Sequence, residues 1–179
     1  MSKFWAFLLV VGIAAGAYGL YTLWGGKSPA SALVAGGGAG SGSESEPVGD
    51  GLPRVVVAPR VRDLGEVSVQ GGTITTLFFV RNAGEGKLVI TDMETSCMCT
   101  EAALIMDGVE GPRLGMRGHG PRPVWSAELA PGQEATLKVY YDPTVHEELR
   151  GPVTRVVRIH TNDPERPYVD IVLDLIQTD

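Results

Sequence analysis

The residues best suited to chemistry are two cysteines, Cys97 and Cys99, which flank Met98. In an extended strand, side chains two positions apart point to the same face, and their Cα atoms lie about 6.6 Å apart. That separation is at the wide edge of disulfide geometry, so a bridge would need a bend in the chain. A bridged pair that is easily reduced would support thiol redox chemistry.

The same cysteines could instead bind a metal or fill space. Thiolates, helped by the Met98 thioether and by His119 further along, suit a copper ion in the Cu(I) state. Zinc fits less well, because it requires four firm ligands. Free cysteines also bury readily, so Cys97 and Cys99 could be small packing residues at a strand end. The sequence leaves packing, disulfide and copper interpretations open.

A second feature is the basic character of residues 106–124, a stretch with five glycines and three prolines. This composition predicts a long loop, and loops of this length inside compact domains are usually functional or disordered. Its cationic side chains could contact an acidic protein partner or anionic headgroups, or only keep the loop soluble. The candidate interaction residues are Arg113, Arg117, His119 and Arg122.

No pattern of an enzyme is present. His146 lies in a predicted turn beside Glu147 and Glu148, and His160 lies on the polar face of a predicted strand beside Arg158, so both are expected to be solvated. No Gly-x-Ser-x-Gly elbow and no phosphate-binding glycine loop occurs. The sequence therefore predicts neither catalysis nor a small-molecule substrate.

Short strands must position these residues. From residue 53 onward, apolar and polar residues alternate in runs separated by Gly, Pro and Asx turn signals, and no 3.6-residue stripe appears. Six to eight such strands predict an all-β, immunoglobulin-like antiparallel β-sandwich over residues 53–179. The clearest runs are 74–80, 87–92, 135–141, 153–160 and 169–176.

The N-terminal part has a different character. Residues 4–24 contain no charged residue and are long enough to span a bilayer as one helix, with aromatic residues near both ends. Lys3 precedes this segment, and acidic residues follow it, which favours a cytoplasmic N-terminus and a periplasmic or extracellular domain. A cleavable signal peptide ending at Ala17 is the alternative. We predict a signal anchor over residues 1–24.

Residues 25–52 are rich in Gly, Ser and Ala and predict a flexible linker, because such a segment cannot bury enough apolar surface to fold. The net charge of -6 over 179 residues gives no indication of nucleic-acid binding, which requires clustered basic residues.

Several motifs together resemble one bacterial family. The motifs are Asp63-Leu64-Gly65, 78–84, 88–90, 96–100, Pro131-Gly132, 140–143 and 161–164. They follow the pattern Phe-x-Phe-x-Asn-Thr-Gly, then Leu-x-Ile, then Ser-Cys-Gly-Cys-Thr, so the chain is similar to domain of unknown function 1573, DUF1573, from about residue 54 to residue 176. Met98 replaces the central glycine of the cysteine motif, and the following loop is longer than usual.

The resemblance implies an Ig-like β-sandwich, related in architecture to major-sperm-protein and Hydin-type domains and usually exported, and it implies no particular activity. Together, these observations predict a membrane-anchored binding or structural module of the cell envelope. Its expected partners are the membrane, through residues 4–24, and an envelope protein; it could also be an accessory subunit of a membrane complex. The alternative is a thiol-redox or copper-binding protein centred on Cys97 and Cys99.

Overall fold

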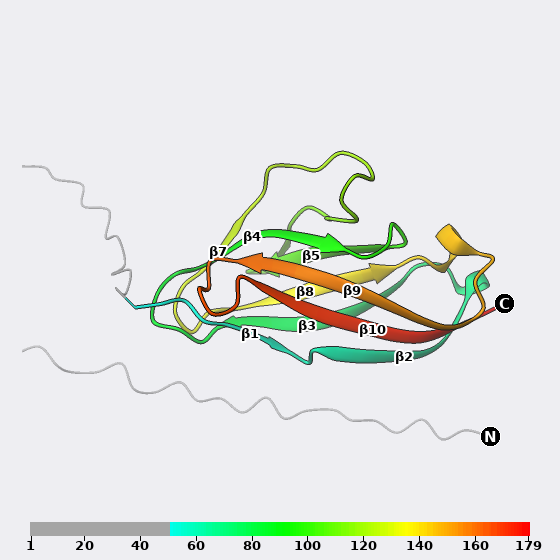
Figure 1. Ribbon diagram of the computed structural model, residues 1–179, viewed down its shortest axis with the longest axis horizontal. Coiled ribbons are helices and arrows are strands. Elements are labelled where there is room, and N and C mark those ends of the chain that lie inside the picture. Colours follow the sequence, from blue (N-terminus) through cyan, green and yellow to red (C-terminus); the bar gives the residue numbers. More distant parts are fainter. Residues whose placement is uncertain (1–50) are drawn as a thin grey trace, which may run out of the picture. The chain divides into compact units, whose positions relative to one another are not determined.

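The computed structural model describes residues 51–179, which form ten strands in two five-stranded sheets (Figure 1). Two short 3-10 helices, η1 (Val69–Gly71) and η2 (Pro143–His146), are the only helices among these residues. The all-β, two-sheet architecture expected from the sequence is confirmed.

The first sheet has the order β1-β3-β8-β5-β6, and all of its pairs are antiparallel. Its strands alternate between buried and exposed residues, as period-two sequences do when one face is covered. Their bounds are β1 Val55–Ala58, β3 Ile74–Asn82, β5 Thr100–Met106, β6 Val109–Glu110 and β8 Glu134–Tyr141.

The second sheet has the order β2-β10-β9-β4-β7 and differs from the expectation at one edge. β2 pairs in parallel with β10, so the sandwich is not purely antiparallel. The reason is that the chain changes sheets at Pro59, between β1 and β2, without reversing its direction. The strands are β2 Val61–Ser68, β4 Leu88–Thr95, β7 Ala127–Leu129, β9 Gly151–Thr161 and β10 Tyr168–Thr178.

The core fills the space between the sheets. Inward-facing residues of both sheets form one large apolar cluster, with Phe78, Leu104 and Leu137 from the first sheet and Ile159 and Ile171 from the second. A smaller cluster lies at the end of the sandwich where Cys99 packs among Val67, Tyr141, Val153 and Leu175. The predicted periodicity of β8, β9 and β10 is thus confirmed by burial.

The prediction of a long loop over residues 106–124 is wrong for the first residues of this range. Asp107 and Gly108, with φ of 51° and 79°, form a two-residue turn that pairs Met106 with Val109 and creates β6. An Asp-Gly pair between strand residues is a strong hairpin signal, because both central positions need positive φ. The chain continues beside β5, where Leu114 bridges to Ala102.

The expected anchor and linker lie outside the described residues, apart from the last two linker positions. Within residues 51–179, no helix is long and apolar enough to cross a bilayer.

Candidate functional site

Cys97 and Cys99 lie in the turn between β4 and β5 and are joined by a disulfide. Their Cα atoms are 5.3 Å apart, closer than in an extended strand, because the chain bends here. The Thr100 amide donates to the Cys97 carbonyl at 3.1 Å, and the Thr95 hydroxyl lies 2.9 Å from the same carbonyl. Of the packing, disulfide and copper interpretations, the structure contains the disulfide. Cys99 is also a packing residue, with 2% of its surface exposed.

Met98 occupies the exposed tip of this turn. Asp107 is the only non-glycine residue with positive φ in the described part of the chain, so Met98 needs no left-handed conformation. Methionine is therefore accommodated without backbone strain at this position, where the resembling pattern has glycine.

Two polar side chains approach the disulfide. The Arg155 Nε of β9 lies 3.0 Å from the Cys99 Sγ. His146, at the end of η2, offers a ring nitrogen that lies within 4.8 Å of both sulfur atoms. The sequence did not indicate this proximity, because β9 and η2 reach the turn only through the tertiary fold.

His119, which the sequence suggested as a copper ligand, is exposed and is not part of the group of close ligand atoms that Cys97, Cys99 and His146 form. It lines a pocket of about 480 Å³ together with Met98 and Met116. A neighbouring pocket of about 260 Å³ contains Met98 and Cys99. Met98 thus lines both pockets. The histidine beside the cysteines is His146 and not His119.

We refer to residues 111–126, between β6 and β7, as the strap. It crosses from the edge of the first sheet to the edge of the second and extends beside β4 and β5 (Figure 1). At its start, the Arg113 guanidinium stacks on the Tyr140 ring at 3.7 Å and lies 3.8 Å from Glu110. The Tyr140 hydroxyl also donates to Glu110 and lowers the pKa of that carboxyl.

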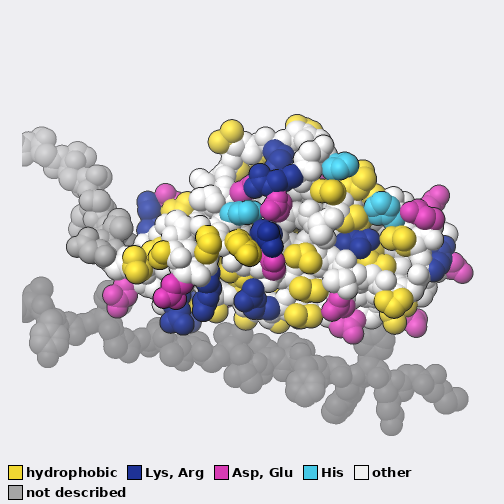
Figure 2. Space-filling view, in the orientation of Figure 1, with side chains coloured by type: hydrophobic (Ala, Val, Ile, Leu, Met, Phe, Trp, Pro, Cys, Tyr) yellow, Lys and Arg dark blue, Asp and Glu magenta, His cyan; other side chains and the backbone are white. Residues whose placement is uncertain are grey.

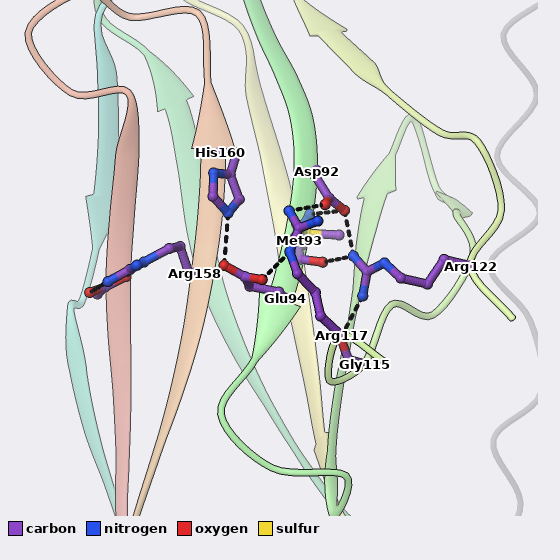
Figure 3. Close-up of polar contacts among 9 residues, drawn as sticks. Asp92, Met93, Glu94, Gly115, Arg117, Arg122, Arg158 and His160 are labelled. Carbon is purple, nitrogen blue, oxygen red and sulfur yellow. Dashed lines mark hydrogen bonds and ion pairs between the residues drawn. The ribbon is translucent and has the colours of Figure 1, made fainter. Parts of the chain in front are cut away.

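The other strap arginines are bound to the outer side of β4 (Figure 3). Arg122 donates to the Asp92 carboxylate at 2.5 Å, to the Met93 carbonyl at 2.6 Å and to the Gly115 carbonyl at 2.7 Å. Arg117 pairs with Asp92 at 2.6 Å and with Glu94. These arginines therefore fasten the strap to the second sheet.

The polar network continues across the outer face of the second sheet. The His160 Nε2 lies 3.0 Å from the Glu94 carboxylate, and Arg158 forms a two-pronged pair with Asp170 at 2.7 and 2.8 Å (Figure 3). Figure 2 shows basic, acidic and histidine side chains gathered near the middle of the visible face. The predicted place of His160 on the polar face beside Arg158 is confirmed.

This network favours the charged form of Glu94 and of Asp170. Burial of Glu94 opposes ionisation, but hydrogen bonds from His160 and Arg117 outweigh it and lower the pKa of the carboxyl. The hydrogen bonds from Arg158 lower the pKa of Asp170. The cluster has the composition of a structural ion-pair network, since each acid has a basic partner.

Comparison with protein families supports the resemblance seen in the sequence. Residues 56–110 match the model of the DUF1573 family, described as a protein of unknown function. The DUF1573 match contains β1 to β6 and the cysteine turn, and it ends where the strap begins. The landmarks after residue 110, such as Pro131-Gly132, lie beyond the matched residues. A comparison with curated proteins gives no match.

Among solved structures, a protein of unknown function from Porphyromonas gingivalis is 20% identical, with a TM-score of 0.53 over 69% of this chain. The chain spans 46% of that protein's length. The PapD-like domain 7 of human CEP192 is 12% identical, with a TM-score of 0.43, and the matched part covers 72% of this chain and 87% of that one. The class 5 fimbriae chaperone CfaA is 10% identical, with a TM-score of 0.40, over 70% and 57% of the two chains.

Proposed function

We propose that the chain is a protein-binding module of the cell envelope, tethered to the membrane by residues 4–24 and held outside the cytoplasm. The observation that carries the proposal is an apolar strip on the outer face of the first sheet. The strip consists of Val56, Leu77 and Phe79, which are 38%, 44% and 46% exposed.

These three side chains form one surface. Leu77 and Phe79 lie two positions apart on β3 and so point to the same face. Phe79 pairs with Ala58 of β1, which places Val56, two positions earlier on β1, diagonally beside it. Single exposed apolar residues are ordinary, but adjoining ones on a sheet face mark interaction sites.

The charges at the end of the strip indicate the chemistry of the partner. Arg54 and Arg81 are exposed, and Arg81 lies opposite Val56 of β1 on one side and opposite Glu134 of β8 on the other, so the net positive charge there comes from Arg54. A partner that presents apolar side chains next to a carboxylate would complement both parts of this surface. The proposed partner is an envelope protein with such a surface.

Side-chain contact fits this surface better than addition of a strand to the β1 edge. The Val55 amide donates to the Asp163 carboxylate at 2.9 Å, and the Val55 carbonyl accepts from Arg166 at 2.9 Å. The edge is thus partly occupied by the protein's own turn, and Pro59 follows β1 directly. A partner is therefore expected to contact the exposed side chains of the strip and not the β1 edge.

Two features support the proposed location. A disulfide between Cys97 and Cys99 is typical of an oxidising compartment outside the cytoplasm. The apolar length of residues 4–24 suits a membrane span.

The test is photo-cross-linking of the full chain in intact bacterial membranes, with a benzophenone amino acid at position 79. We expect one discrete adduct with a second protein, which weakens when Leu77→Asp is added. The matched control carries the same probe at Val109, which is more exposed and lies on β6. Equal adducts at both positions, or an adduct with the mass of two copies of this chain, would contradict the proposal.

A second candidate function, thiol-disulfide exchange, is favoured by the contact of Arg155 with Cys99. A guanidinium at this distance stabilises the thiolate that forms on reduction. In the exchange, a dithiol donates two electrons and two protons, the sulfur-sulfur bond breaks to give two thiols, and the dithiol becomes a disulfide.

This candidate is tested by equilibrating the full chain with mixtures of reduced and oxidised dithiothreitol. The free thiols are then alkylated, and mass spectrometry measures the intact mass of the protein. We expect a reversible transition between zero and two alkylated cysteines. Arg155→Gln should make the disulfide harder to reduce, because the thiolate loses its cation. A transition unchanged in Arg155→Gln would argue against the role of Arg155.

A further inference from the structure

We infer that reduction converts the cysteine turn into a Cu(I) site whose ligands are Cys97, Cys99 and His146. The inference goes beyond the protein-binding function and rests on the second candidate function, because the disulfide must open before the sulfurs can bind a metal. It replaces the histidine that the sequence suggested, His119, by one from a different part of the chain.

The geometry that carries the inference is the proximity of three soft or borderline ligand atoms. The two sulfurs and one ring nitrogen of His146 all lie within 4.8 Å of one another. Ligands on a single metal ion, each about 2.0–2.3 Å from it, are separated by less than this limit. Closure around an ion therefore needs side-chain movement and no rearrangement of the fold.

The fold fixes the two halves of the site against each other. The Asp142 amide donates to the Cys99 carbonyl at 2.8 Å, which ties the start of η2 to the cysteine turn. The Asp142 side chain accepts from the Thr144 amide at 2.9 Å and caps η2. At the other end of η2, the Gln177 side chain donates to the His146 carbonyl at 2.8 Å. His146 is thus held by its backbone, and its ring Nδ1 lies 3.6 Å from the mostly exposed Glu148 carboxylate, a contact that metal binding through Nδ1 would replace.

The number and type of the ligands favour Cu(I). Two thiolates and one Cu(I) leave a net charge of -1, and the Arg155 guanidinium beside Cys99 offsets it. Zinc would lack its fourth protein ligand, whereas sulfur-rich sites with few ligands suit Cu(I).

The site is accessible from one side. Cys99 lines the pocket of about 260 Å³, with Met98 and Val145 at its border. Cys97 and His146 are partly exposed, whereas Cys99 is buried. An ion can therefore enter from solvent and reach a ligand that is shielded from it. On binding, the two thiols each lose a proton to solvent as the sulfur-copper bonds form.

The experiment uses the purified full chain under argon. The reduced and the oxidised protein are titrated with Cu(I), supplied as its acetonitrile complex, in competition with a colorimetric Cu(I) chelator. Thiol alkylation and intact mass report in parallel whether the disulfide has opened. We expect the reduced chain to bind one Cu(I) and the oxidised chain to bind none, and X-ray absorption should show two sulfur ligands and one nitrogen ligand.

Variants assign the ligands. Cys97→Ser and Cys99→Ser should each abolish competition with the chelator, and His146→Ala should weaken binding by about tenfold or more. The matched control is His119→Ala, which removes the exposed histidine that lines the pocket with Met98 and should bind as the parent does. Weakening by His119→Ala with no effect of His146→Ala would overturn the assignment.

The same experiment distinguishes failure of thiol-disulfide exchange from failure of the Cu(I) site. If the mass shows that the disulfide resists reduction, thiol-disulfide exchange is excluded, and the copper site is excluded with it. If the mass shows two free thiols and the chelator keeps all of the copper, only the copper site is overturned.

Discussion

At the scale of single residues, the buried amide of Asn82 joins segments that are far apart in the sequence. Its Nδ2 donates to the Gly86 carbonyl at 2.8 Å and to the Leu129 carbonyl at 3.0 Å. Its Oδ1 accepts from the Gly84 amide at 3.0 Å. A Cβ on Gly84 would lie 2.3 Å from the Leu52 carbonyl oxygen, so the close approach also requires glycine. This explains why an Asn-x-Gly motif ends β3.

We predict that Asn82→Ala lowers the free energy of unfolding by about 2–4 kcal/mol, because it leaves buried carbonyl and amide groups without partners. Urea unfolding followed by circular dichroism measures the loss. The control is Asn162→Ala, because Asn162 also joins backbone groups, the Val89 amide and the Lys87 carbonyl, but is exposed. We expect about 1 kcal/mol or less there. Equal losses would contradict the importance of burial.

The pair of Arg158 and Asp170 predicts a dependence of stability on pH. Because the pKa of Asp170 is lowered in the folded protein, the unfolded chain binds more protons as the solution becomes acidic. The contribution is fully present above the carboxyl's ordinary pKa of about 4 and is lost as the pH falls through the lower, folded value.

Urea midpoints measured from pH 6 to pH 3 should therefore fall less steeply for Asp170→Asn than for the parent. The control is Asp174→Asn on the same strand, because Asp174 accepts from the Thr154 hydroxyl and not from an arginine. Asp170→Asn should flatten the profile more than Asp174→Asn does, because only Asp170 pairs with an arginine. An Asp170→Asn profile as steep as the parent's would show that the ion pair does not contribute.

At the scale of elements, the sequence was informative wherever one face of a strand is buried. The alternation in β8, β9 and β10 reports the burial of every second residue, so these strands could be predicted. The parallel pairing of β2 with β10 could not, because it depends on where the chain changes sheets and not on local periodicity. The meeting of His146 with the cysteines has the same cause, since it depends on the packing of η2.

The strap shows how a glycine-rich and proline-rich segment becomes ordered. Local composition predicted a loop, but Leu114 is buried, and Arg122 bonds two groups on β4, the Asp92 carboxylate and the Met93 carbonyl, and one carbonyl within the strap. The sequence did identify Arg113, Arg117 and Arg122 as notable, and the structure gives each an intramolecular acidic partner. Deletion of residues 106–124 would remove Leu114 from the core, so point substitutions are the better test of this segment.

We predict that Arg122→Gln speeds amide hydrogen exchange across residues 115–122, because the strap loses its attachment to Asp92 and Met93. Mass spectrometry of peptic fragments measures the exchange. Arg117→Gln is the control: its side chain is 56% exposed against 22% for Arg122, and exposed ion pairs contribute little. A larger effect of Arg117→Gln than of Arg122→Gln would reverse this ranking of the two attachments.

At the scale of the whole molecule, the proposed function links the described domain to the segment before it. An apolar strip with a cationic end can select a partner. A membrane tether would confine the domain, and therefore its encounters with partners, to the membrane surface. A coil of 28 residues, which is what the sequence predicts for residues 25–52, has a reach of roughly 30 Å. Under the proposed function, a partner bound through the strip would therefore lie in the same membrane or close to it.

This arrangement predicts where the domain is found in a bacterial cell. The full chain should remain with membranes after alkaline carbonate extraction, whereas a chain without residues 4–24 should be released, because it lacks the apolar span. Protease added to spheroplasts should degrade the domain while a cytoplasmic protein survives. A protected domain would reverse the proposed orientation, and a mature mass lacking the first 17 residues would show cleavage after Ala17. In that case the strip would search for its partner in solution, and contact at Phe79 would no longer depend on a shared membrane.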